Sequence, residues 1–212
     1  MRKIMFNDRF ALTQAVIDGR KTIKRRIAYT KDVRFLNLWW DVKTYQRVIC
    51  DGEFVVARSQ YKIDEVVAIA QSYNKIGLSP SMYCEVPNEY GGTRDGSFDE
   101  LAGWENKMFI KAEYMPHHIK ITNIRVEHLQ EISDKDCLQE GIYFDKEGGQ
   151  SIGYPLAVPF YYTFRGAINR NGKQLYWSIP KDAFAELIDK VSGKGTWDSN
   201  PLVWVYEFEL ID

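Results

Sequence analysis

Residues 202–210, LVWVYEFEL, constrain the fold most because two patterns overlap in one run. Every second residue is apolar: Leu202, Trp204, Tyr206, Phe208 and Leu210. The positions between them change from Val203 and Val205 to Glu207 and Glu209. Since successive side chains of a strand point to opposite faces, this predicts a strand that begins inside a core and leaves it as it ends.

Three stretches carry helical signals. Residues 180–193 have Pro180 in the first turn, apolar residues at i, i+3, i+4 and i+7 after it, and Gly193 at the end. Residues 7–19 and 133–141 begin at residues that can cap a helix and end at a glycine. We expect three helices, of which the last is the longest.

The rest of the chain has the signals of short strands. Two β-rich runs flank Asp51–Gly52 and predict a hairpin with a type I′ turn. Asn171–Gly172 predicts a second hairpin, and residues 63–73 predict a strand buried on both faces. Residues 86–98 are rich in turn-forming residues and predict an irregular surface loop.

Residues 117–129, HHIKITNIRVEHL, change the parity of their apolar positions. A flat strand cannot bury both sets on one face, so we expect a β-bulge near Thr122–Asn123. Many short strands with few helices predict an α+β fold whose sheet curls into a small β-barrel. No shift in composition marks a boundary, so residues 1–212 are expected to form a single domain.

Composition narrows the classes of function. A formal net charge of −1 and a pI near 6.3 argue against a protein that coats polyanions, so any nucleic-acid contact must be local. Cys50, Cys84 and Cys137 are scattered and odd in number, which suits a reducing compartment. No signal peptide or membrane span is evident, so we expect a cytoplasmic protein. The histidine and cysteine spacing indicates no metal site, and no cofactor motif is present.

Residues 19–26, GRKTIKRR, gather five cations: Arg20, Lys21, Lys24, Arg25 and Arg26. If this stretch continues as a strand, Lys21 and Arg25 share one face, while Lys24 and Arg26 share the other. One interpretation is a solvated edge whose charges also offset a helix dipole. The other is that a curled sheet places these cations around a cleft, where they contact phosphates or a base.

The same stretch resembles the signature of the ASCH family, a branch of the PUA-like fold, written G-x-K-x-x-E-x-R. Gly19, Lys21 and Arg26 match, and Lys24 stands where the family has Glu or Thr. Two further stretches are similar to phage- and prophage-type members: HIKITNIRVEHLQEISDKDCLQEGI and AFAELIDKVSGKGTWDSNPLVWVYEFELI. The matched parts occur in the family's order and cover less than half of the chain. Insertions are expected at about 29–60, 74–107 and 142–182.

The resemblance implies a small barrel flanked by helices, with a cleft near the basic signature and RNA or modified nucleotides as ligands. One branch hydrolyses N4-acylated cytidine with a lysine, a threonine and a glutamate. The corresponding residues here are Lys21, Lys24 and Lys120, which leaves no evident base for hydrolysis. Phage-type members often have Glu where this chain has Gln71, an amide that can hydrogen-bond a base edge.

We therefore expect an RNA- or modified-nucleotide-binding protein with a basic cleft and without strong catalysis. The expected ligand-binding residues are Lys21, Lys24, Arg25, Arg26, Gln71, Tyr73, Lys120 and Trp197. Trp197 has two interpretations, a ring that stacks on a base and part of a structural corner in TWDSNP. The alternatives are an amidohydrolase on N4-acylated cytidine, with Lys21 catalytic, and a protein-interaction module of phage or mobile-element origin.

Overall fold

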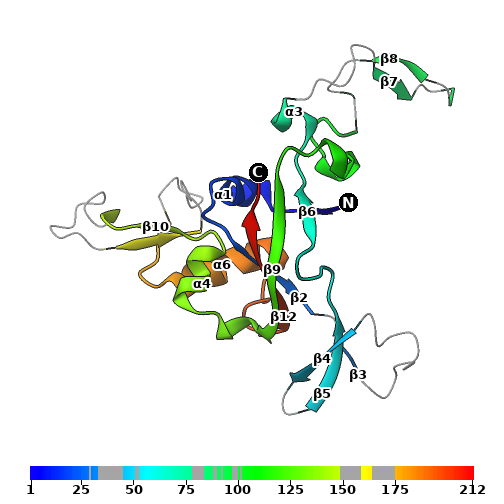
Figure 1. Cartoon of the computed structure of the whole chain (residues 1–212). Coiled ribbons are helices and arrows are strands. Elements are labelled where there is room, and N and C mark those ends of the chain that lie inside the picture. The colour runs from blue at the N-terminus through cyan, green and yellow to red at the C-terminus, as the bar shows by residue number, and fades with distance from the viewer. Residues whose placement is uncertain are drawn as a thin grey trace. The chain divides into compact units, whose positions relative to one another are not determined.

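The computed structural model (Figure 1) describes residues 1–28, 30–32, 45–50, 53–77, 84–87, 90–91, 93–96, 100, 102–148, 159–163 and 175–212. The chain divides into two compact units. Unit 1 consists of Met1–Phe6, Val66–Lys120 and Leu210–Asp212. Unit 2 consists of Asn7–Glu65 and Ile121–Glu209.

Strands contribute most of the regular structure. They are β1 (Arg2–Ile4), β2 (Ile23–Ile27), β3 (Thr30–Asp32), β4 (Tyr45–Cys50), β5 (Glu53–Arg58), β6 (Val66–Ile69), β7 (Cys84–Pro87), β8 (Thr93–Gly96), β9 (His118–His128), β10 (Tyr143–Asp145), β11 (Phe160–Tyr162) and β12 (Leu202–Leu210). The α-helices are α1 (Leu12–Ile17), α3 (Tyr73–Ile76), α4 (Asp134–Gln139) and α6 (Pro180–Ser192). Short 3-10 turns are η1 (Asp8–Phe10), η4 (Lys107–Phe109), η5 (Ala112–Tyr114) and η6 (Leu129–Glu131).

The main sheet has the strand order β1-β6-β9-β12-β2. It is mixed, because β1 pairs with β6 in parallel while β6–β9 and β12–β2 are antiparallel. Three smaller sheets have the orders β10-β11, β3-β5-β4 and β7-β8. The α+β class agrees with the sequence, but the β-barrel prediction is wrong: within the described residues no sheet closes, and β1 and β2 are the two ends of the largest.

The parity change from which we expected a β-bulge lies within one continuous strand. Strand β9 runs without a break from His118 to His128 and passes from unit 1 into unit 2 after Lys120. Alternation of buried and exposed residues ends at Thr122 and Asn123, which are both exposed. Ile119 and Ile121 before this point are fully buried, whereas Ile124 and Val126 after it are half-buried, so one face does not have to bury both sets.

The core of unit 2 is formed by β12 and the helices near it. Residues 202–206 are buried on both strand faces, and Glu209 and Leu210 are exposed, as the sequence predicted. Helix α6 begins with Pro180, buries Ala183, Phe184 and Leu187, and contacts α4. Gly193 follows its last residue, also as predicted.

Unit 1 has its own core around β6. Residues 67–70 are fully buried, which confirms the prediction of a strand covered on both faces. Ala68, Ile110 and Met115 form the centre of a cluster, and Tyr73 and Ile76 of α3 pack against it. Gln71, which the sequence analysis names as an expected ligand-binding residue, lies between β6 and α3.

Two predictions of local structure need correction. The helix expected over 7–19 is divided into η1 and α1, because Ala11 adopts a left-handed conformation with φ 53° and the Asn7 side chain caps only the 3-10 turn. The irregular loop expected over 86–98 is partly regular, since β7 pairs with β8 in an antiparallel register from Cys84↔Gly96 to Pro87↔Thr93.

The predicted pairing around Asp51–Gly52 is confirmed, because β4 and β5 are antiparallel with Cys50 opposite Glu53. The turn type at these two residues and the Asn171–Gly172 hairpin lie outside the described residues. Helix α4 is also confirmed: the Ser133 hydroxyl accepts a hydrogen bond from the Asp136 backbone N–H at 3.1 Å. None of the helices in the described ranges has the length and apolar character needed to cross a membrane.

Candidate functional site

The basic stretch forms the end of α1 and strand β2 in unit 2. Gly19, with φ 72°, ends the helix and lets the backbone N–H groups of Arg20 and Lys21 both donate to the Ala15 carbonyl, at 2.9 and 2.8 Å. From there the predicted alternation holds. Lys21, Ile23 and Arg25 are buried, Thr22 and Lys24 are half-buried, and Arg26 is exposed.

Lys21 lies inside unit 2 with its side chain only 3% exposed. Its ammonium group donates to the carbonyl of Ile23 at 2.7 Å, to the carbonyl of Glu140 at 2.8 Å and to the Glu140 carboxylate. An ammonium has three protons, so these three acceptors use all of them. Burial lowers the pKa of Lys21, although the attraction of Glu140 opposes that shift.

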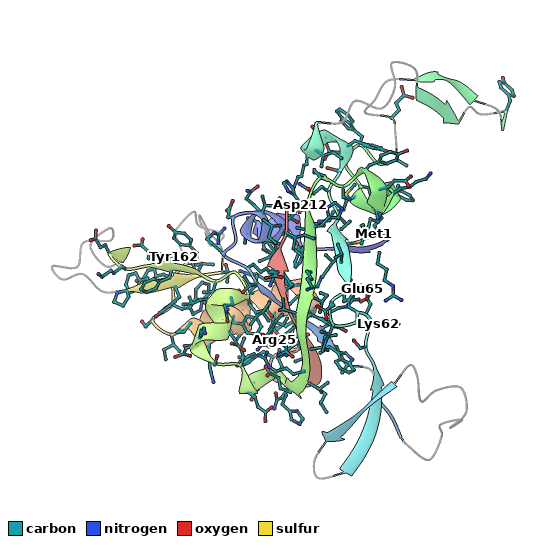
Figure 2. All side chains as sticks on the ribbon, in the orientation of Figure 1. Met1, Arg25, Lys62, Glu65, Tyr162 and Asp212 are labelled. Atoms are coloured by element: carbon teal, nitrogen blue, oxygen red, sulfur yellow. The ribbon has the colours of Figure 1, made fainter. Side chains whose placement is uncertain are left out.

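Arg25 is 1% exposed and is surrounded by carboxylates. Its Nη2 donates to Glu127 at 2.6 Å and to Asp136 at 2.8 Å, Nε donates to Glu127 at 3.2 Å, and Nη1 donates to Glu140 at 3.1 Å. Burial alone would lower the pKa of Arg25, but Glu140, Glu127 and Asp136 together raise it. Figure 2 shows Arg25 among the packed side chains near β9 and α4.

Arg125 of β9 extends this cluster toward the surface. Its Nε donates to Glu127 at 2.9 Å, its Nη2 to Asp136 at 2.6 Å and its Nη1 to Glu207. We call the whole cluster the buried ion network; its members are Lys21, Arg25, Arg125, Glu127, Asp136, Glu140 and Glu207. The network joins Lys21 and β2 to β9, β12 and both ends of α4.

The buried ion network explains why charged side chains can lie in this interior. Buried charges are tolerated when each has a partner and its remaining hydrogen-bonding groups are satisfied. Asp136 gives an example: burial would raise its pKa, but the hydrogen bonds from Arg25 and Ser133 lower it below the usual 3.8. The network is therefore structural: its ion pairs hold together elements that are far apart in the sequence.

Sequence reasoning did not find the acidic half of this network. Asp136 and Glu140 are four residues apart, which places them on the same side of α4. That spacing is a usable signal, but the pattern of residues 133–141 by itself predicts only a capped helix. Glu127 and Glu207 lie on strands that come together only in the folded chain.

The opposite side of β2 carries Lys24 and Arg26. In the antiparallel register Lys24 is opposite Tyr206 and Arg26 is opposite Trp204, so the four side chains share one side, which we call the Lys24/Arg26 face. Arg26 donates to the Gln60 side-chain oxygen. The Gln60 backbone N–H in turn donates to the Tyr206 hydroxyl at 3.0 Å.

Tyr61 covers the aromatic part of the Lys24/Arg26 face. Its ring meets Tyr206 edge to face with centroids 5.1 Å apart, and both residues are buried. The rings of Trp204 and Tyr206 are 6.4 Å apart and close to parallel. This face therefore combines two outward cations with a layer of aromatic rings beneath them.

Trp197 belongs to the same unit as β2. Its ring meets Phe184 edge to face at 6.1 Å, and the Arg25 guanidinium lies 5.9 Å from the Phe184 ring centre. Its backbone N–H donates to Asp189 at 2.9 Å, and its carbonyl accepts from Gln130 at 2.9 Å. These contacts hold Trp197 in a structural corner, where the residue is half-buried.

Gln71, Tyr73 and Lys120 belong to unit 1. Gln71 is 7% exposed, and its side-chain oxygen is buried without a hydrogen-bond partner in the described structure. The Tyr73 backbone N–H donates to the Gly103 carbonyl at 3.0 Å, and its ring packs in the unit 1 core. Lys120 is half-buried opposite Val66. The expected residues are thus divided: Lys21, Lys24, Arg25, Arg26 and Trp197 belong to unit 2, and Gln71, Tyr73 and Lys120 to unit 1.

Other reactive groups in the described residues give no second constellation. No group of three His, Cys, Asp or Glu side chains there could hold a metal ion. Cys137 on α4 is fully buried, and burial raises the pKa of its thiol to about 12, which makes it a poor nucleophile.

Comparisons with protein-family models, with curated proteins and with solved structures found no match to this chain.

Proposed function

We propose that this protein binds RNA or a modified nucleotide through the Lys24/Arg26 face. The observation that carries the proposal is the division of charge between Lys21 and the cations of β2. Lys21 and Arg25 donate inward to carboxylates, while Arg26 is exposed on the opposite side and donates to the neutral amide oxygen of Gln60. A guanidinium bound to a neutral acceptor can exchange it for a phosphate and gain a charge-assisted hydrogen bond.

The chemistry of the Lys24/Arg26 face agrees with a phosphate contact. Phosphates are contacted mainly by arginine and lysine, and such contacts position a nucleic acid without reading its sequence. A chain with a net charge of −1 can offer only a local patch of this kind. The resemblance of three stretches to ASCH proteins, in the family's order, favours the same class of ligand.

Hydrolysis of an N4-acylated cytidine is the alternative. The sequence argument against it is that lysines at positions 24 and 120 leave no evident base, but in the structure the Glu140 carboxylate contacts Lys21. The geometry gives a different objection, because all three protons of the Lys21 ammonium are donated within the protein and the group is 3% exposed. A reacting lysine must reach its substrate, so we base the proposal on binding.

The test is the affinity of the protein for single-stranded RNA, measured by fluorescence anisotropy with Lys24→Glu and Arg26→Glu variants. The matched control is Lys190→Glu on α6, which changes the net charge equally and lies in an i, i+4 pair with Glu186. The proposal is supported if Lys24→Glu and Arg26→Glu weaken RNA binding and Lys190→Glu does not. Equal affinities of all proteins would contradict it. Release of cytidine from acetylcytidine, lost in Lys21→Ala, would favour the hydrolase instead, and capture of a protein partner that is insensitive to Lys24→Glu would favour an interaction module.

A further inference from the structure

Among the described residues, two buried polar atoms on the Lys24/Arg26 face lack a hydrogen-bond partner. Four buried side-chain nitrogen or oxygen atoms share this property in the described ranges, and they belong to Thr22, Gln71, Thr163 and Trp204. Trp204 is opposite Arg26 in the register, and Thr22 directly precedes β2 with the parity of Lys24. Buried polar groups are normally paired, because an unpaired one loses its hydration without a replacement. This face therefore has unused hydrogen-bonding capacity as well as charge.

The indole N–H of Trp204 is the better placed of the two groups to bind a ligand specifically. Trp204 is 2% exposed, whereas Thr22 is half-buried. An indole nitrogen can only donate, so the partner that it lacks is an acceptor. The neighbouring ring on this face is different: the Tyr206 hydroxyl accepts from the Gln60 backbone N–H at 3.0 Å and lies 3.3 Å from the Ser59 hydroxyl. Of these two rings, Trp204 is the one whose polar group is unused.

We infer that the Trp204 indole N–H donates a hydrogen bond to an acceptor on an unpaired base of the ligand. The inference rests on the proposed function, and it adds recognition of the base to contact with phosphate. Trp204 lies in the buried aromatic layer of the face, whereas Arg26 is exposed. A phosphate is charged, and burying it against aromatic rings costs far more than burying the neutral carbonyl or ring nitrogen of a base. A base in a duplex uses its pairing edge, so a single strand or a free nucleotide is the expected ligand.

Arg26 connects the phosphate contact with the base contact. Because Arg26 and Trp204 are directly opposite each other, their Cβ atoms are about 4.5–5.5 Å apart. Two contacts hold Gln60 at this place: its side-chain oxygen accepts from Arg26, and its backbone N–H donates to Tyr206. In the proposed complex a phosphate replaces Gln60 at the guanidinium. This removes one of the two contacts and frees the Gln60 side chain to move, which gives a base access to Trp204.

The direct test is the indole N–H resonance of Trp204 in ¹⁵N-labelled protein, assigned by its loss in Trp204→Phe. Oligouridylate, whose bases carry carbonyl acceptors, should move this resonance downfield, because a hydrogen bond deshields the donated proton. An abasic oligomer with the same phosphate backbone should not produce this downfield shift. A resonance that saturating oligouridylate leaves unmoved would overturn the inference.

The energetic test replaces Trp204 by benzothienylalanine, which has sulfur in place of the N–H group in a ring of almost the same shape. The replacement removes the donor without creating a cavity. It leaves the acceptor of a bound base unpaired, so the affinity for oligouridylate should fall by roughly 5- to 150-fold. The affinity for the abasic oligomer should not change. The same replacement at Trp177, which forms a bridge with Tyr161 of β11, is the matched control and should change neither affinity. Unchanged binding of oligouridylate after the replacement at Trp204 would contradict the inference.

The Lys24→Glu and Arg26→Glu variants distinguish this inference from the proposed function. If they weaken both oligomers while the replacement at Trp204 weakens neither, the proposed function stands and the base contact is wrong. If the replacement at Trp204 weakens oligouridylate while the charge reversals change neither affinity, the base contact stands and the phosphate contact is wrong. If the wild type binds neither oligomer, both are wrong.

Discussion

The ammonium group of Lys21 lies against the carboxylate of Glu140, a residue 119 positions later in the chain, and the two side chains are 3% and 6% exposed. The contact fixes the start of β2 to the C-terminal end of α4. Bulk water cannot hydrate either charge, so both depend on partners within the protein: Lys21 on the Glu140 carboxylate and two carbonyls, and Glu140 on Lys21 and Arg25. Loss of Lys21 would leave Glu140 with Arg25 as its charged partner, and loss of the Glu140 carboxylate would leave the Lys21 ammonium buried with two carbonyls and no anion.

Lys21→Met should therefore destabilise the protein strongly. Removing one partner of a buried pair typically costs about 3–5 kcal/mol in the free energy of unfolding. Glu140→Gln should have an effect of the same order, and the double variant should cost less than the sum of the single variants because no unpaired charge remains. Urea denaturation of the four proteins measures this coupling.

The exposed pair of Arg20 and Asp18 provides the control for that experiment. Its side chains are 40% and 41% exposed and 3.3 Å apart. Surface ion pairs contribute about 0–1 kcal/mol, so Arg20→Met should change the free energy of unfolding little. Equal losses in Arg20→Met and Lys21→Met would show that the burial of Lys21 has no energetic consequence.

Arg25→Lys tests the geometry of the buried ion network rather than its charge. The guanidinium of Arg25 reaches Glu127, Asp136 and Glu140 with three different nitrogens, which a single ammonium nitrogen cannot do. Each charged hydrogen bond that is lost costs about 1.5–3 kcal/mol. Thermal unfolding should show a large loss for Arg25→Lys and almost none for Arg26→Lys. An unchanged melting temperature in Arg25→Lys would mean that a positive charge at this position is sufficient for stability, whatever its geometry.

The sequence predicted one half of this network well. Alternation correctly separated Lys21 and Arg25 from Lys24 and Arg26, because the period of a strand is set by local backbone geometry. The caps of α4 and α6 were also predicted, since a cap lies within a few residues of the groups that it satisfies. Local rules thus predict which face of the strand each cation occupies, but they do not predict which residues it contacts there.

The acidic half could not be placed in the same way. Glu127 and Glu207 are on β9 and β12, and their distance from β2 depends on strand order, which no local pattern specifies. The barrel prediction failed for a related reason: it rested on the number of short strands, and no local pattern specifies whether such strands close into a barrel or form an open sheet.

Asp136→Asn should show a stability defect that depends on pH. The folded-state pKa of Asp136 is below the usual 3.8. Its carboxylate therefore stabilises the fold fully above that unfolded-state value, and this contribution is lost as the pH falls through the folded-state pKa. The difference in melting temperature between wild type and Asp136→Asn should be large at pH 7 and should shrink in acid. A difference that is constant with pH would contradict the assigned ionisation.

Cys137 should report on the opening of α4. With Cys50→Ser and Cys84→Ser, it is the single thiol of the chain. A pKa of about 12 and full burial leave only about one thiol in ten thousand ionised at pH 8. A disulfide reagent such as dithionitrobenzoate should thus react slowly with the native protein and at once in urea. Adding Lys21→Met should accelerate the native reaction, and rapid labelling without it would contradict the burial of Cys137.

RNA binding through the Lys24/Arg26 face should depend weakly on salt. Each phosphate contact to a single strand contributes about −0.7 to the slope of log affinity against log salt, so two contacts give roughly −1.4. Because Lys21 and Arg25 are already paired with carboxylates, they should not add to the slope. Removing Arg26 by Arg26→Gln should reduce the slope by about half, whereas Lys190→Gln should not change it. A flat response in the wild type would exclude phosphate contact at this face, and a slope far steeper than two contacts allow would point to cations elsewhere in the chain.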